Sequence, residues 1–387
     1  MKWRAFPEDV LPLWVAEMDA TLPPAVVEEV HDLLTRGDTG YAWPVEYVAA
    51  FTEFAADLWD WSVDPVQCRT VTDVMVGIEE MTRILLPDGG RVIIDDPVYD
   101  AFPLHIENIR RNTARVPLTA EGRLALHQLE RAFAEARADG SPAVYWLCNP
   151  QNPTGTVPTK SELTALAEIA HRTGVRVVSD EIHAPLVDVH ADFVPYLTVA
   201  PRGITATSPS KSCNLAGLKA GLVVAGEEAS DVLAALHPVV SYAASHVAIR
   251  AHTVAYREGR DWLEQVRAEI RDNRALLGEL LAEHLPKARW REPQATYLAW
   301  INLTHLRLGS QPARTLAKRA RVALGEGANY GPAGQGHVRM NLATSPEIIR
   351  EAISRIDDLV DDWQECASDV AAVLPAHLEE GLTDLTE

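Results

Sequence analysis

Cysteine is scarce in this chain, which has four among 387 residues. The four are far apart and show neither the paired spacing of a zinc site nor the density of a disulfide framework. We therefore expect no bound metal and no disulfide-stapled fold. Disulfides persist mainly in oxidising compartments, so the composition favours a cytoplasmic protein. The cysteines are Cys68, Cys148, Cys213 and Cys366.

Long apolar runs are missing as well. No stretch approaches the roughly 20 residues that a membrane span needs, and the opening MKWRAFPEDV has no apolar core of a signal peptide. Basic residues are in the minority, because 35 lysines and arginines face 55 acidic residues, for a net charge of −20. Such a surplus repels phosphate backbones and anionic lipids, so we expect no nucleic-acid partner and no membrane partner.

What the chain does have is a regular alternation of short β-rich runs and helix-period stretches between about residues 71 and 226. Alternation of this kind is typical of βαβ units and a mostly parallel sheet. We predict an α/β fold whose large domain holds this sheet. The expected strands are 74–77, 91–95, 114–118, 143–148, 175–179, 204–208 and 220–226.

The pattern changes after about residue 245. A long helical stretch at 247–285 leads to strand-like segments at 296–303, 321–331 and 337–343, and a helical pattern returns at 346–363. We predict three parts: an N-terminal arm at 1–44 that packs on the small domain, a large domain at 45–246, and a smaller α+β domain at 247–387. The last of these ends in the acidic tail HLEEGLTDLTE.

Polar residues follow several of the expected strands. Ligands of open α/β sheets bind beyond the carboxyl ends of the strands, so these side chains should converge on one edge. Together they supply an aromatic ring, an amide, a carboxylate, an imidazole, an amine and small hydroxyls. They are Tyr99, Asn149, Asn152, Asp180, His183, Ser208, Ser210 and Lys211.

This set matches the needs of one cofactor, pyridoxal 5′-phosphate. Its aldehyde needs a lysine amine, and its pyridine nitrogen needs a carboxylate that keeps it protonated. Its phosphate needs hydroxyls and the N–H groups of a helix N-terminus, and its ring needs an aromatic face. Each residue alone also has a plainer interpretation: Lys211 as a surface lysine, Asp180 as a helix cap, Tyr99 as core, and His183 as a buried hydrogen-bonded histidine.

The motifs NPQNPTG (149–155), SDEIHAPLV (179–187) and SPSKSCNLAGLKAG (208–221), in this order, resemble fold-type I pyridoxal phosphate enzymes of the class I and II aminotransferase superfamily. Within it, LPLWVAEMDATLPPAV (11–26), GYAWP (40–44), DEIHA and HVRMNLA are similar to the MalY/PatB branch of cystathionine β-lyases, or C–S lyases. The resemblance runs over nearly the whole chain and fades after about Trp363. It implies the aspartate-aminotransferase-like fold, with a seven-stranded, mostly parallel sheet and a smaller α+β C-terminal domain.

The resemblance also implies residue roles. Lys211 would bond covalently to the cofactor and act as acid and base, Asp180 would pair with the pyridine nitrogen, and Asn152 and His183 would lie near the ring's 3-oxygen. Tyr99 would stack on the ring. Arg339 would bind the substrate α-carboxylate, and Tyr41 would reach the site from the second subunit of a homodimer. The phosphate would be held by the backbone of Gly77 and Ile78 and by Ser208, Ser210 and Lys219.

Two residues near the expected phosphate site depart from what their positions favour. Lys219 stands where many aminotransferases have an arginine, and lysine lacks the guanidinium fork. Glu79 lies near the expected phosphate-binding helix start, where an anion would repel a phosphate.

The resemblance implies β-elimination from cystathionine or another S-substituted L-cysteine, which yields a thiol, pyruvate and ammonia. Two alternatives stay open at this point. An aminotransferase would use the same residues with another fate for the Cα carbanion, and a regulatory protein would keep the cofactor but act by binding a partner. The sequence does not identify the sulfur substituent.

Overall fold

A computed structural model of the protein describes residues 1–87 and 89–373, with side chains described up to residue 361. Cys366 and the acidic tail expected at 377–387 lie outside these described side chains. The seven-stranded sheet has the order β2-β8-β7-β6-β5-β3-β4. Its strands are β2 (Cys68–Val71), β3 (Arg91–Asp96), β4 (Asn112–Pro117), β5 (Ala143–Cys148), β6 (Arg176–Asp180), β7 (Ile204–Thr207) and β8 (Gly221–Ala225).

The sheet is mostly parallel, as the alternating pattern predicts. Only β8 runs against its two neighbours, β2 and β7, while the pairs from β7 through β4 are all parallel. The carboxyl ends of the central strands therefore meet at one edge. Cys148 at the end of β5 is the register partner of Asp180, and Asp180 at the end of β6 is the partner of Ala206 in β7.

One expected strand is wrong. Residues 74–77 begin a helix, α3 (Val74–Leu85), and the edge strand lies earlier, at β2. Asp73 caps this helix, because its carboxylate accepts the N–H of Val76 over 2.9 Å. The buried Val74, Ile78 and Met81 recur at helical spacing. A short apolar run does not by itself distinguish a buried strand from a helix start, and here the cap decides.

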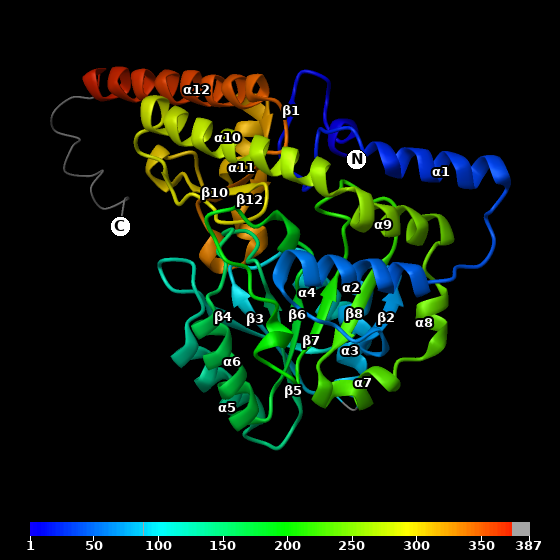
Figure 1. Ribbon diagram of the computed structural model, residues 1–387. Coiled ribbons are helices and arrows are strands. Elements are labelled where there is room, and N and C mark those ends of the chain that lie inside the picture. The colour runs from blue at the N-terminus through cyan, green and yellow to red at the C-terminus, as the bar shows by residue number, and fades with distance from the viewer. Residues whose placement is uncertain (88, 374–387) are drawn as a thin grey trace.

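Helices cover both faces of the sheet. Val92 and Ile94 point to one face, where they pack with α3 and with α4 (Ala101–Asn108), while Ile93 points to the other. On that second face α5 (Leu126–Arg137) and α6 (Lys160–Thr173) cover the sheet, and they lie side by side in Figure 1. The other helices of this region are α1 (Pro24–Arg36), α2 (Val45–Trp59), α7 (Ser230–Ala234) and α8 (Pro238–Tyr242).

The expected long helix at 247–285 is two helices, α9 (His246–Glu258) and α10 (Arg260–His284), which meet at Gly259. The second region is α+β, as expected. It contains a four-stranded antiparallel sheet in the order β12-β13-β10-β9, packed against α10 and α12 (Pro346–Val373). Its other elements are β9 (Arg289–Trp290), β10 (Leu298–Asn302), α11 (Pro312–Arg319), β11 (Val322–Ala323), β12 (Gly325–Glu326) and β13 (His337–Asn341).

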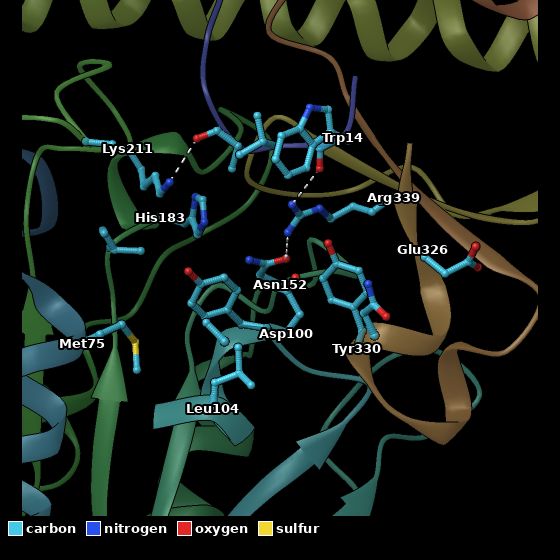
Figure 2. A pocket seen from close by; sticks show the side chains of 18 of the residues that line it. Trp14, Met75, Asp100, Leu104, Asn152, His183, Lys211, Glu326, Tyr330 and Arg339 are labelled. Carbon is cyan, nitrogen blue, oxygen red and sulfur yellow. Dashed lines mark hydrogen bonds between the residues drawn. The ribbon is translucent and has the colours of Figure 1, made fainter. Parts of the chain in front are cut away.

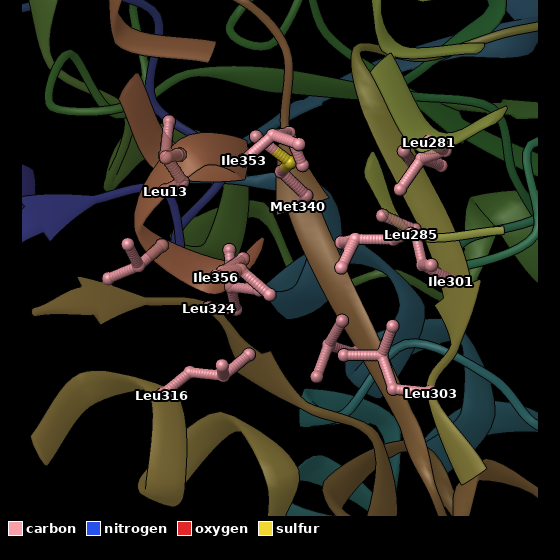
Figure 3. Packing of buried hydrophobic residues seen from close by; sticks show 14 of the residues in the cluster. Leu13, Leu281, Leu285, Ile301, Leu303, Leu316, Leu324, Met340, Ile353 and Ile356 are labelled. Atoms are coloured by element: carbon pink, nitrogen blue, oxygen red, sulfur yellow. The ribbon is translucent and has the colours of Figure 1, made fainter. Parts of the chain in front are cut away.

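The core of this second region is aliphatic. Figure 3 shows Leu281, Ile301, Met340 and Ile353 gathered between the sheet and the helices. Close packing of this kind holds β13 rigidly. The rigidity matters because Arg339 lies on β13 next to Met340, with its side chain on the opposite face of the strand.

The N-terminal segment lies against both regions. Its strand β1 (Leu11–Pro12) pairs in parallel with β11, where Leu11 is the partner of Val322. Further along, α1 packs on α9. The domain limits at residues 44 and 246 stay a prediction. Among the described residues, no helix has the length and apolar character needed to cross a membrane.

Candidate active site

A cavity of about 950 Å³ opens at the carboxyl edge of the large sheet. Its walls come from the loops after β3, β5, β6 and β7, from the start of α3, and from the second region. The arm residues Trp14, Val15 and Ala16 also line it. In Figure 2 the side chains of Lys211 and Arg339 enter the cavity from opposite sides.

Lys211 lies in the tight loop that follows β7. Its ammonium donates to the carbonyl oxygen of Ala16 over 3.0 Å. Burial, aided by the positive charge of Arg339, lowers the pKa of Lys211 to about 8. A larger share of this amine is neutral at pH 7 than of an ordinary lysine, and the neutral form is the nucleophile and the base.

Asp180 ends β6 and is buried. Burial raises the pKa of Asp180 to about 6, although the Ile182 N–H, 3.1 Å from Oδ1, and the charge of Lys211 act in the other direction. A buried carboxylate with so few donors would gain from a cationic partner such as a protonated pyridine nitrogen.

His183 follows Asp180 in the same loop and lies edge-on to the ring of Tyr297. Burial and the charges of Lys211 and Arg339 lower the pKa of His183 to about 3. The imidazole is therefore neutral at physiological pH. Its Nδ1 is buried without a partner among the described residues.

Asn152 and Arg339 meet at the centre of the cavity. Both are buried, and Nη1 of Arg339 donates to Oδ1 of Asn152 over 3.1 Å. Nη2 of Arg339 donates to the Trp14 carbonyl oxygen, and the guanidinium lies 4.9 Å from the centre of the Tyr330 ring. This fixed and desolvated fork can bind a carboxylate through two parallel hydrogen bonds.

The remaining expected cofactor residues divide into two groups. Tyr99, Ser210 and Lys219 line the cavity. Burial, with neighbouring acids, raises the pKa of Tyr99 to about 12, so the phenol stays neutral. Ser208 lies beneath the cavity wall: its hydroxyl donates to the Ala220 carbonyl over 2.8 Å and accepts the N–H of Ser210.

The structure places Gly77 and Ile78 one turn inside α3 rather than on the cavity. The N–H of Gly77 is used by the Asp73 carbonyl, and Ile78 is buried in the core. The residues of this helix start that do line the cavity are Asp73, Val74 and Met75.

Gly77 has another purpose. A Cβ there would lie 2.7 Å from Cγ1 of Val223, so glycine lets α3 approach β8 closely.

Two further charges at this end are now explained. The carboxylate of Glu79 turns to α4, where it contacts His105 Nδ1 and accepts from Asn108 Nδ2 over 2.9 Å. It is therefore occupied away from the start of α3. Lys219 pairs with the Asp73 carboxylate over 3.1 Å, which holds its ammonium beside the N-terminus of α3, the end of a helix that favours an anionic group.

Tyr41 also lies outside the cavity. It is fully exposed in the loop before α2, together with Trp43. Nothing in a single chain brings it toward Lys211.

The arm supplies site groups that sequence reasoning missed. The Ala16 carbonyl accepts from both Lys211 and the Tyr297 hydroxyl. Asn341 holds the arm by donating to the carbonyls of Val15 and Glu17, over 2.7 and 2.6 Å. The LWVAEMD motif marked this segment as unusual, but a backbone carbonyl has no signature in a sequence.

On the other side Asn214, three residues after Lys211, bonds both the N–H and the carbonyl of Met18. The arm is thus fastened to the Lys211 loop and to the Arg339 strand.

This arrangement brings a nucleophilic amine, a buried carboxylate, an amide, an aromatic ring and a carboxylate-binding guanidinium to one cavity beside a helix N-terminus. The residues could hold a planar pyridine aldehyde that carries a phosphate. No group of histidine, cysteine and acidic side chains in the described part of the chain could hold a metal ion.

Comparison with known proteins agrees with this geometry. A curated protein of Mycobacterium leprae, named "Putative cystathionine beta-lyase", is 45% identical over 92% of this chain and 93% of its own length. The cystathionine beta-lyase of Corynebacterium glutamicum is 31% identical over 92% of this chain and 95% of its own. A crystal structure from Corynebacterium diphtheriae, described as a "putative plp-dependent beta-cystathionase", is 34% identical, with a TM-score of 0.86 over 93% of this chain and 95% of that one.

The model of the family "Aminotransferase class I and II" matches residues 8–356, a span that contains the cavity, the arm strand and both sheets. Lys211 and Asp180 lie within the matched span. This chain is a member of the class I and II aminotransferase family.

Proposed function

We propose that this protein is a pyridoxal 5′-phosphate-dependent C–S β-lyase that cleaves cystathionine or another S-substituted L-cysteine to a thiol, pyruvate and ammonia. The observation that carries the proposal is the placement of Lys211, Asp180 and Arg339 around one cavity. They supply an amine of lowered pKa, a buried carboxylate and a buried guanidinium. The relatives named cystathionine beta-lyase support the reaction type.

The cavity residues fit this cofactor. Lys211 is the amine for its aldehyde, and Asp180 is the partner of its pyridine nitrogen. Tyr99 offers a ring face, and Asn152, with the neutral His183, offers hydrogen bonds near the 3-oxygen. The phosphate site uses Ser210, Lys219 and the N–H groups of Val74 and Met75. Gly77, Ile78 and Ser208 support that site from beneath.

When bound, pyridoxal phosphate withdraws electrons from the substrate Cα and so acidifies its proton. Asp180 keeps the proton on the pyridine nitrogen. Arg339 binds the α-carboxylate and fixes the orientation of the amino acid. Lys211, as a neutral amine, accepts the Cα proton, and the departing sulfur takes up a proton as the Cβ–S bond breaks. Addition of water to the remaining three-carbon unit yields pyruvate and ammonia.

We further propose a cytoplasmic homodimer. Cys68, Cys148 and Cys213 are free and buried, in keeping with a reducing compartment. Tyr41, Trp43 and Val45 are exposed on one short segment, and exposed aromatic clusters mark protein interfaces. In the dimer, Tyr41 completes the partner's active site.

An aminotransferase is the second candidate, and the family to which the chain belongs favours it. The two reactions share the loss of the Cα proton and differ in whether sulfur leaves. The test is to supply L-cystathionine with and without 2-oxoglutarate. We expect pyruvate, ammonia and thiol in equal amounts, independent of the keto acid. If glutamate forms when 2-oxoglutarate is present and no thiol is released, the protein is an aminotransferase and not a lyase.

A further inference from the structure

The cavity continues beyond the groups that the proposed reaction uses. At its inner end lie the buried Asp180, Asn152 and His183. At its outer end, exposed side chains of α11 line it. A volume of about 950 Å³ is near the top of the range of roughly 300–1,000 Å³ for small-molecule sites. The cofactor and the amino acid would occupy the inner part of this volume, and the side chains of α11 border its outer part.

Two cations lie along this outer wall. Arg314 and Lys318 stand four residues apart on α11, so they share one face of the helix, and both line the cavity. Nη1 of Arg314 donates to the Gln311 side chain over 3.1 Å. Within the described side chains neither cation has a carboxylate partner in an ion pair. In a chain with 55 acidic and 35 basic residues, two unpaired cations side by side stand out.

The acidic groups of the cavity do not cancel these cations. Glu326 faces the first turn of α11, where its Oε2 accepts the Arg314 N–H over 3.3 Å. Burial raises the pKa of Glu326. Asp100 belongs to the other wall, at the start of α4, and Figure 2 shows it apart from Glu326. Glu326 thus contacts α11 through the backbone of Arg314, and among the described residues it forms no ion pair with either side-chain cation.

The outer wall is joined to the Arg339 strand. Gly325 is the register partner of Arg339, and Glu326 is the partner of Val338. Glu326 on β12 contacts Arg314 at the start of α11. Only β12 therefore separates the start of α11 from β13, which carries Arg339. A substrate held at Arg339 has this wall as its neighbour.

We propose that Arg314 and Lys318 form a subsite for an anionic group at the far end of the sulfur substituent. The preferred substrates are then S-substituted L-cysteines whose substituent ends in a carboxylate. This inference rests on the proposed lyase function, because that function makes the substrate an S-substituted cysteine whose substituent lies beyond the sulfur atom.

Two matched substrates separate charge from length. S-(3-Carboxypropyl)-L-cysteine and S-butyl-L-cysteine have substituents of equal carbon number, and only the first is anionic. For the Arg314→Gln/Lys318→Gln variant we expect KM for the carboxylate substrate to rise by about tenfold or more, with kcat nearly constant. KM for the butyl substrate should change by less than about twofold. The control, Lys287→Gln/Arg350→Gln, removes the same charge at exposed positions outside the cavity, and both substrates should keep their KM.

Calorimetric binding of both compounds to the holoenzyme keeps this test separate from the reaction. The wild type could release no pyruvate and still bind the carboxylate compound more tightly than the butyl compound, with the difference lost in the Arg314→Gln/Lys318→Gln variant. In that case the lyase proposal fails and the subsite stands. Equal losses on both compounds, or no loss on the carboxylate compound, overturn the subsite. A charge-reversed variant, Arg314→Glu/Lys318→Glu, should instead favour S-(3-aminopropyl)-L-cysteine. Failure of this reversal in a folded, cofactor-loaded protein also counts against the subsite.

Discussion

Arg339 and Asn152 touch each other directly: Nη1 of the arginine lies 3.1 Å from Oδ1 of the amide. The residue proposed to hold the substrate carboxylate is thus bonded to the residue proposed to hold the cofactor. Arg339 lies on β13 and Asn152 in the loop after β5, and 187 positions separate them in the chain. This bond couples the second region to the large sheet at the point where the reaction takes place.

The first prediction concerns the shape of this arginine. Arg339→Lys keeps the charge but loses the fork, so the amino acid would be held by one bond instead of two. We expect KM for L-cystathionine to rise by about tenfold to a hundredfold, since hydrogen bonds to charged groups contribute about 1.5–3 kcal/mol. Steady-state pyruvate release measures it, with the exposed Arg350→Lys as control. An unchanged KM would show that Arg339 does not bind the carboxylate.

The second prediction identifies the lysine that binds the cofactor. The pKa of Lys211 is lowered to about 8, whereas Lys219 is exposed and paired with Asp73. Borohydride reduction of the yellow protein should therefore fix the cofactor on the peptide that contains Lys211. Lys211→Ala should abolish the reduced adduct, and Lys219→Ala should keep it while weakening cofactor affinity. An adduct mapped to Lys219 would overturn the assignment.

The third prediction tests the shared site. Lys211→Ala and Tyr41→Phe should each reduce activity strongly. Mixed dimers of the two variants contain one site with both native residues if Tyr41 acts across the interface. We expect about a quarter of wild-type activity after full subunit exchange, because half of the dimers are then mixed and each has one good site of two. Exchange proven by mass spectrometry without recovery would place Tyr41 outside the partner's site.

The fourth prediction concerns folding and pH. Burial raises the pKa of Asp95 to about 7 and that of Glu181 to about 8. Between pH 6.5 and 8 the folded protein therefore binds protons that the unfolded chain has released, and the free energy of unfolding falls as the pH rises. The lowered pKa values of His183 and His252 oppose this fall near pH 6.5, where unfolded histidine is still partly protonated, and that of Lys211 opposes it near pH 8.

Urea unfolding of the cofactor-free protein at pH 6.5 and pH 8 checks this sign. Glu181→Gln has no carboxyl group to titrate, so the fall in the free energy of unfolding should become smaller by up to about 1.4 kcal/mol per pH unit. The neutral amide can keep the contacts to Asn149, Ser179 and Tyr196. The exposed Glu168→Gln should leave the slope as it is. A wild type that is equally stable at both pH values would contradict the raised pKa values.

The sequence could predict the site where the fold brings loops together by rule. Asn152, Asp180 and Lys211 follow parallel strands, so an edge shared by those strands places them side by side. The resemblance implies that the backbone of Gly77 and Ile78 holds the phosphate, with a strand expected at 74–77. The cap at Asp73 turns that segment into a helix, so the residues at the helix start are Val74 and Met75. Element boundaries of this kind depend on one side-chain bond.

The arm could be predicted to pack on the second region but not to line the cavity. The Ala16 carbonyl reaches Lys211 only because Asn214 and Asn341 hold the arm from two sides. Asparagine is a common residue at turns, and its role here depends on contacts between residues 196 and 326 positions apart. No local pattern carries such information.

The pairing of β1 with β11 has a consequence for the order of events during synthesis. Leu11 leaves the ribosome long before its partner Val322 is synthesised. The Trp14 carbonyl likewise is made long before Arg339, which donates a hydrogen bond to it. The large sheet, complete at Ala225, can form while the arm is still without its strand partner. A chain halted before residue 321 can therefore have Lys211, Asp180 and Asn152 in place. It lacks Arg339, and the arm has no β11 to pair with over the cavity. The ability to bind an amino acid arises only as the last part of the chain is made.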